Sequence, residues 1–551
     1  MRIETYRLGL LLFTALLVNA CGGGGGGSGS SQNISQSSSA QSNTSSSQTD
    51  FEKGIFSPAS TYADMCGAPR TGIDSSTGSA FPDGQGTFVD ENNWIRAWSN
   101  DLYLWYSEIE DVDPESYSGS TSAVLEYFDL MKSFETTASG ASKDRFHFTY
   151  DTEEWNAYSQ SGVTAGYGAE WVLLSSSPPR KIVVAYTEPN SPATTGDANL
   201  ARGAEILTAD GVDVINGSDT ATLNAAFFPA NTGETHTFEV KDLGSEETRT
   251  ISLTSASVTI DPVQNVKVLE TDSGKVGYLT FNNHIATAES ELISAITTLS
   301  ESNVTDLVLD LRYNSGGYLA IASQLAYMIA GPSASGQTFE LLQFNDKHPS
   351  TNPVTGNALT PTPFYSNSIG LSVSEGSALP YLNLSRVFVL TSADTCSASE
   401  AIMNGLRGID VEVIQIGGTT CGKPYGFYGL DNCGTTYFSI QFKGVNAKGY
   451  GDYSDGFSPV NTATVEGEPL PGCVVSDDYE HALGDANEAM LSAALNYRST
   501  SGSCPALPVA LSEMKNARSN TTSTETIGEA PLSTMQRPNL PGRVALKRQN
   551  H

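Results

Sequence analysis

Between residues 276 and 416, short strand-like runs alternate with longer stretches of helical spacing. The run 306–311, for example, is mostly apolar, which is typical of a strand buried on both faces. The segments between such runs repeat apolar residues every three or four positions, as amphipathic helices do. This alternation predicts an α/β domain in which crossover helices cover a layered sheet. We expect strands at 276–281, 306–311, 386–390 and 411–416, and helices at 288–299, 319–330 and up to 406.

Two other patterns precede this domain, and the 551-residue length is enough for roughly three or four domains. Helical spacing over 94–131 predicts a small N-terminal helical domain, which we place at 51–157. Short strand-like runs separated by Gly, Pro, Asn and Asp predict a small β domain at 158–260. The α/β domain is placed at 261–500. For 501–551 we expect a flexible tail, with docking of its basic end on the protein, or mimicry of a substrate end, as the alternative.

The N-terminus has the pattern of an export signal. Two arginines precede an apolar run over residues 8–18, which is too short to span a bilayer as a stable anchor, so residues 1–20 are predicted to be a signal peptide. The letters VNAC at 18–21 resemble the bacterial lipobox, which implies lipidation of Cys21; an ordinary secretory signal is the alternative. Residues 21–50, rich in Gly and Ser, predict a flexible tether. We expect an outer-membrane lipoprotein facing the periplasm or the cell surface.

Charge and cysteine content limit the partners. With 29 Lys and Arg against 61 Asp and Glu, the net charge of −32 disfavours binding to nucleic acid. The cysteines other than Cys21 suit an oxidising compartment. Local loop closure favours Cys421 with Cys433 and Cys473 with Cys504, although sequence alone cannot fix the pairing. No CxxC spacing or Cys/His cluster supports a metal site.

A serine follows the strand predicted at 386–390. Residues 391–406 read TSADTCSASEAIMNGL, so Ser397 lies where the strand turns into a helix. The first N–H groups of a helix are unpaired and its dipole favours negative charge, which is the environment that a serine nucleophile and its oxyanion need. The alternative is structural, because Ser397 and Glu400 also fit the S-x-x-E capping box.

Two further segments carry candidate chemistry. Residues 417–424, GGTTCGKP, place Lys423 after a strand, where burial would favour a neutral amine able to act as a base; a solvated surface lysine is the alternative. This segment nearly spells the nucleotide-binding P-loop, but Pro424 replaces the hydroxyl that would ligate Mg²⁺. Residues 310–317, DLRYNSGG, end in Gly316 and Gly317, which either point N–H groups at an oxyanion or simply form a turn.

Together these three segments resemble the motifs of the C-terminal processing peptidases, also called tail-specific proteases. The family patterns DLRxNxGG, S-A-S-A-S-E and G-x-T-x-G-K-G correspond, in the same order, to DLRYNSGG, TCSASE and GGTTCGKP. The resemblance implies an α/β multidomain serine peptidase with a crotonase-like ββα core, an inserted PDZ domain and no metal or cofactor. It assigns Ser397 as nucleophile, Lys423 as general base, and the N–H groups of Gly316 or Gly317 and of Ala398 as the oxyanion hole.

The chain departs from the family pattern at several positions. Cys396 replaces an alanine directly before the nucleophile, Pro424 replaces a glycine, and Phe427 stands where many members carry a glutamine that orients the lysine. Glu400 occupies the place of a family glutamate and is expected to orient the Ser-Lys dyad. His284, just past a strand, leaves a Ser-His arrangement as an alternative.

Two stretches in 158–260 resemble a PDZ domain. Gly166, Tyr167 and Gly168 resemble the loop that binds a peptide's terminal carboxylate, and 190–211 resembles the pattern NSPA…L..GD.I…G. A PDZ domain captures a chain end as an added strand; a purely structural β domain is the alternative. We therefore expect a serine endopeptidase that cleaves exported proteins or peptides, with a catalytically inactive peptide-binding lipoprotein of the same fold as the alternative.

Overall fold

A six-stranded sheet forms the centre of the α/β part of the chain. In the computed structural model its order is β12-β13-β14-β17-β18-β25; β12 is antiparallel to β13 and the other neighbours are parallel. The strands are β12 Val263–Thr271, β13 Gly274–Phe281, β14 Asp306–Asp310, β17 Arg386–Thr391, β18 Glu412–Gly417 and β25 Gly472–Val474. The structure describes residues 51–74, 77–175, 178–460, 467–500 and 502–505, and the backbone of Arg543–Val544.

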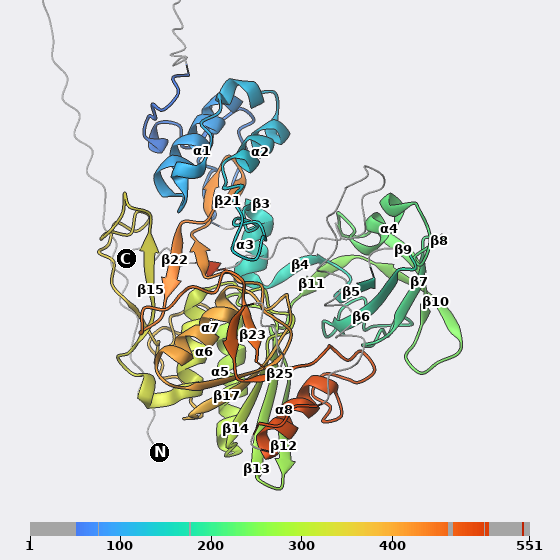
Figure 1. Cartoon of the computed structure of the whole chain (residues 1–551). Helices are drawn as coiled ribbons and strands as arrows, with labels where there is room; N and C mark the ends of the chain where they lie inside the picture. Colours follow the sequence, from blue (N-terminus) through green and yellow to red (C-terminus); the bar gives the residue numbers. More distant parts are fainter. Residues whose placement is uncertain are drawn as a thin grey trace, which may run out of the picture. The chain divides into compact units, whose positions relative to one another are not determined.

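Helices cover both faces of this sheet, so successive residues of a central strand are buried against opposite helical layers. Leu307 and Leu309 of β14 belong to the apolar cluster of α5, α6 and α7, whereas Val308 belongs to the cluster of α8. Figure 1 shows α5 to α7 on one side of the sheet and α8 on the other. The helices are α5 Ala288–Glu301, α6 Leu319–Ala330, α7 Ala398–Gly408 and α8 Ala489–Ser499. The predicted layered α/β arrangement is confirmed.

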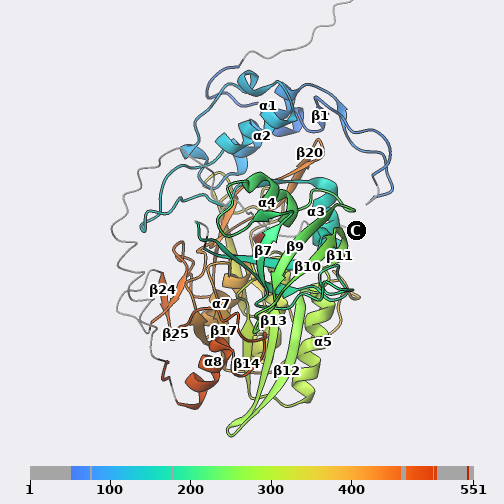
Figure 2. The same cartoon turned by 90° about the vertical axis from the view of Figure 1, so that its right-hand side faces the viewer.

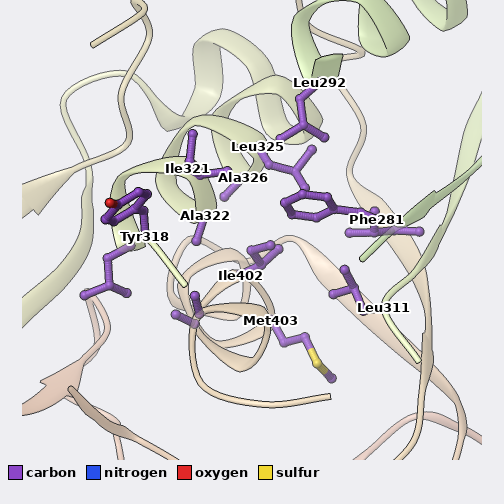
Figure 3. Packing of buried hydrophobic residues seen from close by; sticks show 14 of the residues in the cluster. Phe281, Leu292, Leu311, Tyr318, Ile321, Ala322, Leu325, Ala326, Ile402 and Met403 are labelled. Atoms are coloured by element: carbon purple, nitrogen blue, oxygen red, sulfur yellow. The ribbon is translucent and has the colours of Figure 1, made fainter. Parts of the chain in front are cut away.

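Helix α7 is anchored by apolar packing along its length. In Figure 3, Ile321, Ala322 and Leu325 of α6 lie beside Ile402 and Met403 of α7. All five side chains are fully buried. Since close-packed interiors resist displacement, this contact fixes the N-terminus of α7 relative to the sheet.

The strands and helices predicted for the α/β part are all present. The ends differ from the predicted ones by a few residues: the strand predicted at 411–416 is β18 Glu412–Gly417, and the helix predicted to reach 406 ends at Gly408. The sequence patterns did not reveal α8, nor a second sheet of order β16-β15-β22-β19-β26. Its strands are β16 Thr362–Pro363, β15 Thr338–Phe344, β22 Phe442–Val445, β19 Tyr425–Phe427 and β26 Arg543–Val544.

Part of the C-terminal tail pairs with this second sheet. Strand β26 runs parallel to β19, with Arg543 opposite Gly426 and Val544 opposite Phe427. Because β19 begins two residues after Lys423, the tail backbone lies along the strand that leads away from this lysine. For these two residues the structure agrees with the docking alternative.

The region from β4 to β11, which we call the small β region, contains a separate sheet. Its order is β10-β9-β7-β6-β5, with β8 paired to β7, so β5 is an edge strand. Its own apolar cluster includes the buried Phe227 and Phe238. The elements are β4 Val163–Gly166, β5 Ala169–Ser175, β6 Lys181–Thr187, β7 Glu205–Ala209, β8 Val212–Asp213, α4 Thr220–Phe227, β9 Thr235–Lys241, β10 Thr248–Thr254 and β11 Ala256–Thr259.

Helices dominate the N-terminal part, as the spacing over 94–131 predicts. Helix α1 starts at a capping box in which the Thr87 N–H donates to Asp90 Oδ2 at 2.9 Å and the Asp90 N–H donates to Thr87 Oγ1 at 3.2 Å. The longer helices are α1 Phe88–Leu102, α2 Thr121–Leu130 and α3 Thr152–Ser161; short 3₁₀ helices lie at Ala59–Thr61, Tyr106–Glu108, Pro114–Tyr117 and Gly331–Ala334. The remaining strands are β1 Met65–Cys66, β2 Gly84–Gln85, β3 Phe148–Asp151, β20 Leu430–Asn432, β21 Thr435–Phe438, β23 Phe457–Pro459 and β24 Glu468–Leu470.

The predicted signal peptide, the tether and Cys21 lie outside the described residues. Within the part of the chain that the structure does describe, none of the helices has the length and apolar character needed to cross a membrane. The predicted disulfide between Cys473 and Cys504 is confirmed, and it joins β25 to the segment after α8.

A buried glutamate, Glu188, and a half-buried one, Glu291, hold the segment that links β11 to β12. Glu188 is 7% exposed and accepts hydrogen bonds from the Asp261 N–H and from Gln264 Nε2, both at 3.0 Å. Glu291 accepts one from the Val263 N–H at 2.9 Å. Burial outweighs these hydrogen bonds and raises the pKa of Glu188 to about 8 and the pKa of Glu291 to about 7.

We therefore expect the chain to lose stability as the pH rises from about 4.5, the ordinary pKa of a glutamate, through about 7 to 8. A carboxyl group whose pKa is raised by folding stabilises the folded state fully below its unfolded pKa, and this contribution disappears above the folded pKa. The free energy of unfolding should fall by on the order of a few kcal/mol across this window, and Glu188→Gln should remove much of the fall. Urea unfolding on either side of the window measures it. An equal fall in parent and variant would contradict the expectation.

Candidate active site

Ser397 occupies a strained turn between β17 and α7. It has φ 58° and ψ −107°, a conformation that residues with a side chain rarely adopt and that costs about 1–3 kcal/mol. Sharp strand-to-helix turns of this kind present the nucleophilic serine of α/β-hydrolases. The serine residue is fully buried. The strain and the packing of α7 together hold Ser397 in a defined position at the helix N-terminus.

The Glu400 carboxylate joins this turn to the loop that carries Lys423. Its Oε2 accepts the N–H groups of both Ser397 and Lys423, each at 2.8 Å. Its Oε1 accepts the Gly422 N–H at 2.9 Å and the Thr420 hydroxyl at 2.6 Å. Burial raises the pKa of Glu400, against the lowering effect of these hydrogen bonds. Glu400 caps the helix as the capping-box alternative predicts, but it also brings the two predicted catalytic residues together.

Lys423 is buried, so the alternative of a solvated surface lysine is wrong. The residue is 2% exposed, and its Nζ lies 4.3 Å from the centroid of the Phe427 ring and 4.8 Å from that of Phe146. Phe427 therefore contacts the lysine from the position where many C-terminal processing peptidases, which the motifs resemble, carry a glutamine. Phe146 comes from the segment between α2 and β3, a contact that nothing in the sequence indicates. The two rings shield the amine from solvent.

A disulfide joins the same two segments. Cys396 bonds to Cys421, with Cα atoms 5.1 Å apart. The predicted pair Cys421–Cys433 is wrong, since Cys433 bonds to Cys66. The physical reason is that β17 and β18 are parallel neighbours, so the loops that follow them meet at one edge of the sheet. For the disulfide pairing, the position of the loops in the sheet therefore mattered more than the separation of the cysteines along the sequence.

The disulfide also accounts for a cluster of potential metal ligands. Among the described residues, Cys396, Glu400 and Cys421 are the only group of side chains close enough together to hold an ion. Metal binding requires cysteine thiolates, and both sulfurs are bonded to each other. The Glu400 oxygens already accept backbone N–H groups. This donor set therefore does not suit a metal.

The predicted oxyanion glycines lie against the serine turn. Gly316 has φ 109°, and a Cβ atom there would come within 3.0 Å of the Ala398 nitrogen and 3.1 Å of Ser397 Cβ. Gly317 has φ 139°, and a Cβ atom there would lie 2.5 Å from the His284 carbonyl oxygen. Both positions require glycine for conformation and for space, so backbone can approach the predicted nucleophile Ser397 closely here.

The directions of the backbone bonds distinguish the two glycines. The His284 N–H donates to the Gly316 carbonyl at 3.2 Å, and the Tyr318 N–H donates to the His284 carbonyl at 2.8 Å. Gly317, which lies between them, therefore turns its N–H to the side away from His284. Within the described residues, neither this N–H nor that of Ala398 has a hydrogen-bond partner.

Asn314, to which the sequence analysis gave no role, organises this corner. Its Oδ1 accepts the Gly316 N–H at 3.0 Å and bonds to His284 Nδ1 at 2.9 Å, while its carbonyl accepts the Cys396 N–H at 3.1 Å. The Gly316 N–H is therefore engaged, which leaves Gly317 as the better candidate of the two glycines predicted to donate to an oxyanion. The sequence did contain a signal for Asn314, because it matches the asparagine of the DLRxNxGG pattern.

His284 is buried beside the glycine pair. Burial lowers its pKa to about 3, so the ring is neutral at ordinary pH. The bond to the Asn314 amide oxygen assigns the ring proton to Nδ1. Nε2 has no partner among the described residues. The ring also lies 4.4 Å from that of Phe281.

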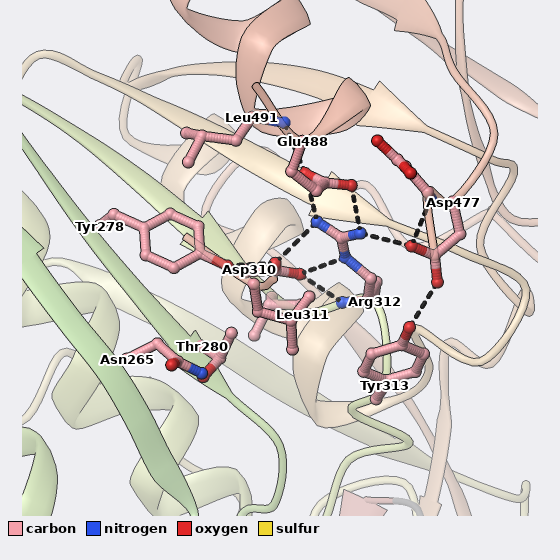
Figure 4. Close-up of polar contacts among 12 residues, drawn as sticks. Asn265, Tyr278, Thr280, Asp310, Leu311, Arg312, Tyr313, Asp477, Glu488 and Leu491 are labelled. Carbon is pink, nitrogen blue, oxygen red and sulfur yellow. Dashed lines mark hydrogen bonds and ion pairs between the residues drawn. The ribbon is translucent and has the colours of Figure 1, made fainter. Parts of the chain in front are cut away.

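A buried ion-pair network lies directly behind the glycine loop (Figure 4). Arg312 is almost completely buried; its guanidinium donates to Asp310 at 2.9 and 3.0 Å and to Glu488 at 2.7 and 3.1 Å. It also donates to Asp477 at 2.5 Å, and Asp477 accepts a hydrogen bond at 2.6 Å from Arg202 of the small β region. Although burial opposes it, the two arginines lower the pKa of Asp477. The network ties β14 to α8 and both to the small β region.

The predicted peptide-binding residues lie between β4 and β5. Gly166 ends β4, and the Tyr167 side chain is buried, with its hydroxyl donating to the Ala226 carbonyl at 3.0 Å. Gly168 has φ 73°, and a Cβ atom there would collide with Ser191 at 2.3 Å. The carbonyls of Tyr167 and Gly168 accept N–H groups of the same region, which fixes the loop at the start of the edge strand β5.

Comparison with known proteins finds similarity in the α/β part. Residues 275–426 match the model of Peptidase family S41. The chain is 31% identical over 170 residues to a carboxyl-terminal-processing protease of Picosynechococcus, and 32% identical over 166 residues to the chloroplastic carboxyl-terminal-processing peptidase 2 of Arabidopsis thaliana. These matches cover 30% and 29% of this chain, and only 39% and 30% of the relatives' own lengths.

One solved structure adds a likeness of fold. It is that of a Bacteroides fragilis protein assigned to the S41 proteases, with a TM-score of 0.54 and 23% identity, covering 74% of this chain and 98% of the other. The family match spans the loop of Gly316 and Gly317, Ser397 and Lys423. The likeness of fold extends well beyond it.

Proposed function

We propose that the chain is a serine endopeptidase that cleaves protein or peptide substrates with Ser397 as nucleophile and Lys423 as general base. The observation that carries this proposal is the shared oxygen of Glu400, which accepts the N–H groups of both residues inside a buried site. The match to Peptidase family S41 spans both residues. A Ser-Lys pair is a known variant of serine-hydrolase catalysis.

In this mechanism Lys423 takes the hydroxyl proton of Ser397 as the oxygen attacks the peptide carbonyl. The negative charge on the former carbonyl oxygen is stabilised by the N–H groups of Gly317 and Ala398, which have no other hydrogen-bond partner in the part of the chain that the structure describes. The ammonium group then returns the proton to the leaving amine, and water hydrolyses the acyl-enzyme through the same base. Loss of one oxyanion donor typically costs about 10²–10³-fold in rate.

Glu400 acts as a positioning residue in this account. Its carboxylate oxygens accept hydrogen bonds from Ser397, Thr420, Gly422 and Lys423, so it aligns backbone rather than moving a proton. His284 is the second candidate for the base, favoured by its neutral state and by an Nε2 atom that has no hydrogen-bond partner within the described ranges. Substitution of each residue separates the two candidates, as described in the Discussion.

We also propose that the small β region is a PDZ-like domain that captures chain ends. Strand β5 is an edge strand, and edge strands can accept an extended peptide as an additional strand. The loop of Gly166, Tyr167 and Gly168 leads directly into β5, as a carboxylate-binding loop requires. Leu174 of β5 is 46% exposed and offers an apolar contact to a bound side chain.

The pairing of the C-terminal tail with β19 supports the proposal that substrate binds along this strand, next to Lys423. Strand β26 pairs with β19, which supports the idea that an extended chain fits beside this strand. We propose that the substrate backbone uses this edge and competes with the tail. Removal of residues 530–551 should therefore lower KM for an unstructured peptide by about 3–10-fold with kcat unchanged, because a tethered competitor is lost. Steady-state kinetics check this, and an unchanged KM would contradict it.

For location, we propose an exported lipoprotein anchored in the outer membrane through Cys21. The three disulfides support an oxidising compartment, where such bonds persist. Mass spectrometry of the membrane fraction tests the anchor: a lipid-modified Cys21 at the mature N-terminus is expected. A mature chain cleaved elsewhere and lacking lipid would overturn this part.

The peptidase proposal is tested by incubating the purified full chain with an unfolded protein and sequencing the products. New chain ends that appear with time are expected. Binding of the unfolded protein without cleavage would instead favour the catalytically inactive peptide-binding lipoprotein.

A further inference from the structure

The Cys396–Cys421 disulfide lies at the junction between the two predicted catalytic residues. Cys396 directly precedes Ser397, and Cys421 lies two residues before Lys423. The cysteines are partly exposed, whereas Ser397 and Lys423 are buried. The bond thus closes the outer side of the site while the catalytic pair lies inside.

The two joined segments extend beyond the sheet that supports them. The pairing of β17 with β18 ends at Thr391 and Gly417, so both loops run several residues past the last ladder contact before they reach the catalytic pair. Over that distance the direct links between them include the Cys421 N–H to the Thr395 carbonyl at 3.0 Å and the Glu400 carboxylate. The disulfide is the covalent link among these contacts.

The sequence around Lys423 explains why a covalent link is useful here. Phe427 contacts the Lys423 amine through its ring and cannot hold it by an oriented hydrogen bond, as an amide side chain could. The ring of Phe146 also gives the amine a contact without a fixed direction. The backbone of the lysine loop therefore contributes to the placing of the amine, and the disulfide holds that backbone.

We infer that the Cys396–Cys421 disulfide is a positioning element for catalysis, which sets the distance between the Ser397 hydroxyl and the Lys423 amine. This inference rests on the proposed function. Without the bond the chain folds, but the two loops separate and the proton transfer from Ser397 becomes slow. A displacement of about 1 Å in such a pair can cost about 10²-fold in rate.

The test compares two double variants. Cys396→Ala/Cys421→Ala should lower kcat for an unfolded substrate by at least about tenfold and change KM less than about threefold, because the substrate edge remains in place. The matched control is Cys473→Ala/Cys504→Ala, which removes a disulfide of similar sequence separation, 31 against 25, away from the site. This control should lower the melting temperature to a similar extent and leave kcat within twofold.

A second readout needs no substrate. A fluorophosphonate reacts with an activated serine, so its rate of reaction with Ser397 should fall in the first double variant and not in the control. The same loss should follow treatment of the folded parent with a water-soluble phosphine, which consumes one water and converts the disulfide into two thiols and a phosphine oxide. Oxidised glutathione should restore the rate by re-forming the bond and releasing two molecules of reduced glutathione.

The outcomes separate this inference from the proposed function. If the parent cleaves substrate and Cys396→Ala/Cys421→Ala keeps its kcat and labelling rate within twofold, the positioning role is overturned and the peptidase stands. If kcat falls equally in both double variants, in step with melting temperature, the bond only stabilises the fold and the inference is again overturned. If the parent neither cleaves nor reacts at Ser397, the proposed function itself fails. If Cys396→Ala/Cys421→Ala does not fold, the labelling rate of the reduced parent is used instead, after circular dichroism has shown that the reduced parent is folded.

Discussion

Ser397→Ala and Lys423→Ala are each expected to reduce proteolysis of an unfolded substrate by at least about 10³-fold, because each removes one member of a pair that acts as a unit. Both substitutions truncate buried side chains, so the fraction of folded protein must be measured beside the rate. Cleavage followed by gel electrophoresis or a fluorescent peptide gives the rate.

Three variants serve as controls for this pair. Ser399→Ala lies in the same motif and removes a hydroxyl that donates to the Asn314 carbonyl at 3.0 Å, so it should cost some stability but keep the nucleophile. Lys448→Ala removes an exposed lysine paired with Asp410 and should leave activity unchanged. His284→Ala should lose less than about tenfold. A loss of about 10³-fold in His284→Ala together with an active Lys423→Ala would make the histidine the base.

Arg312→Met is expected to have the largest effect on stability. Removal of the guanidinium leaves the carboxylates of Asp310 and Glu488 buried without their cation, and breaking a buried ion pair in this way costs about 3–5 kcal/mol. Figure 4 shows both acids converging on the one guanidinium. Urea unfolding followed by circular dichroism measures the loss.

The cause of that loss can be separated from simple packing. In Arg312→Met/Glu488→Met one unpaired acid is also removed, so stability should recover part of the way towards the parent. Arg407→Met breaks the partly exposed pair with Glu468 and should cost no more than about 1 kcal/mol. If Arg312→Met costs no more than Arg407→Met, the network of Figure 4 does not hold the core as described.

The local patterns of the sequence predicted the elements of the α/β part well, because period and apolar content are properties of short segments. The helix predicted at 319–330 is α6, with the same ends. The sequence also predicted that the loops after β17 and β18 carry the candidate catalytic residues. The grouping of Ser397, Glu400 and Lys423 also followed from motifs that can be read along the chain.

Contacts between segments that are distant in the sequence could not be predicted from these local patterns. Phe146 contacts Lys423 from the segment between α2 and β3, and Arg202 of the small β region contacts Asp477, which follows β25. The pairing of Cys421 with Cys396 follows from the parallel register of neighbouring strands, which sequence separation does not reveal. Such contacts depend on how elements pack, so a single sequence carries no local signal for them.

The most direct measurement of the central claim is the rate at which a fluorophosphonate modifies Ser397, located by mass spectrometry, in the parent and in Lys423→Ala. If Lys423 activates Ser397, the parent should be modified at Ser397 alone, and the rate in Lys423→Ala should fall by at least about 10²-fold while the variant stays folded. Modification at another residue, or an equal rate in the two proteins, would contradict a Ser-Lys peptidase.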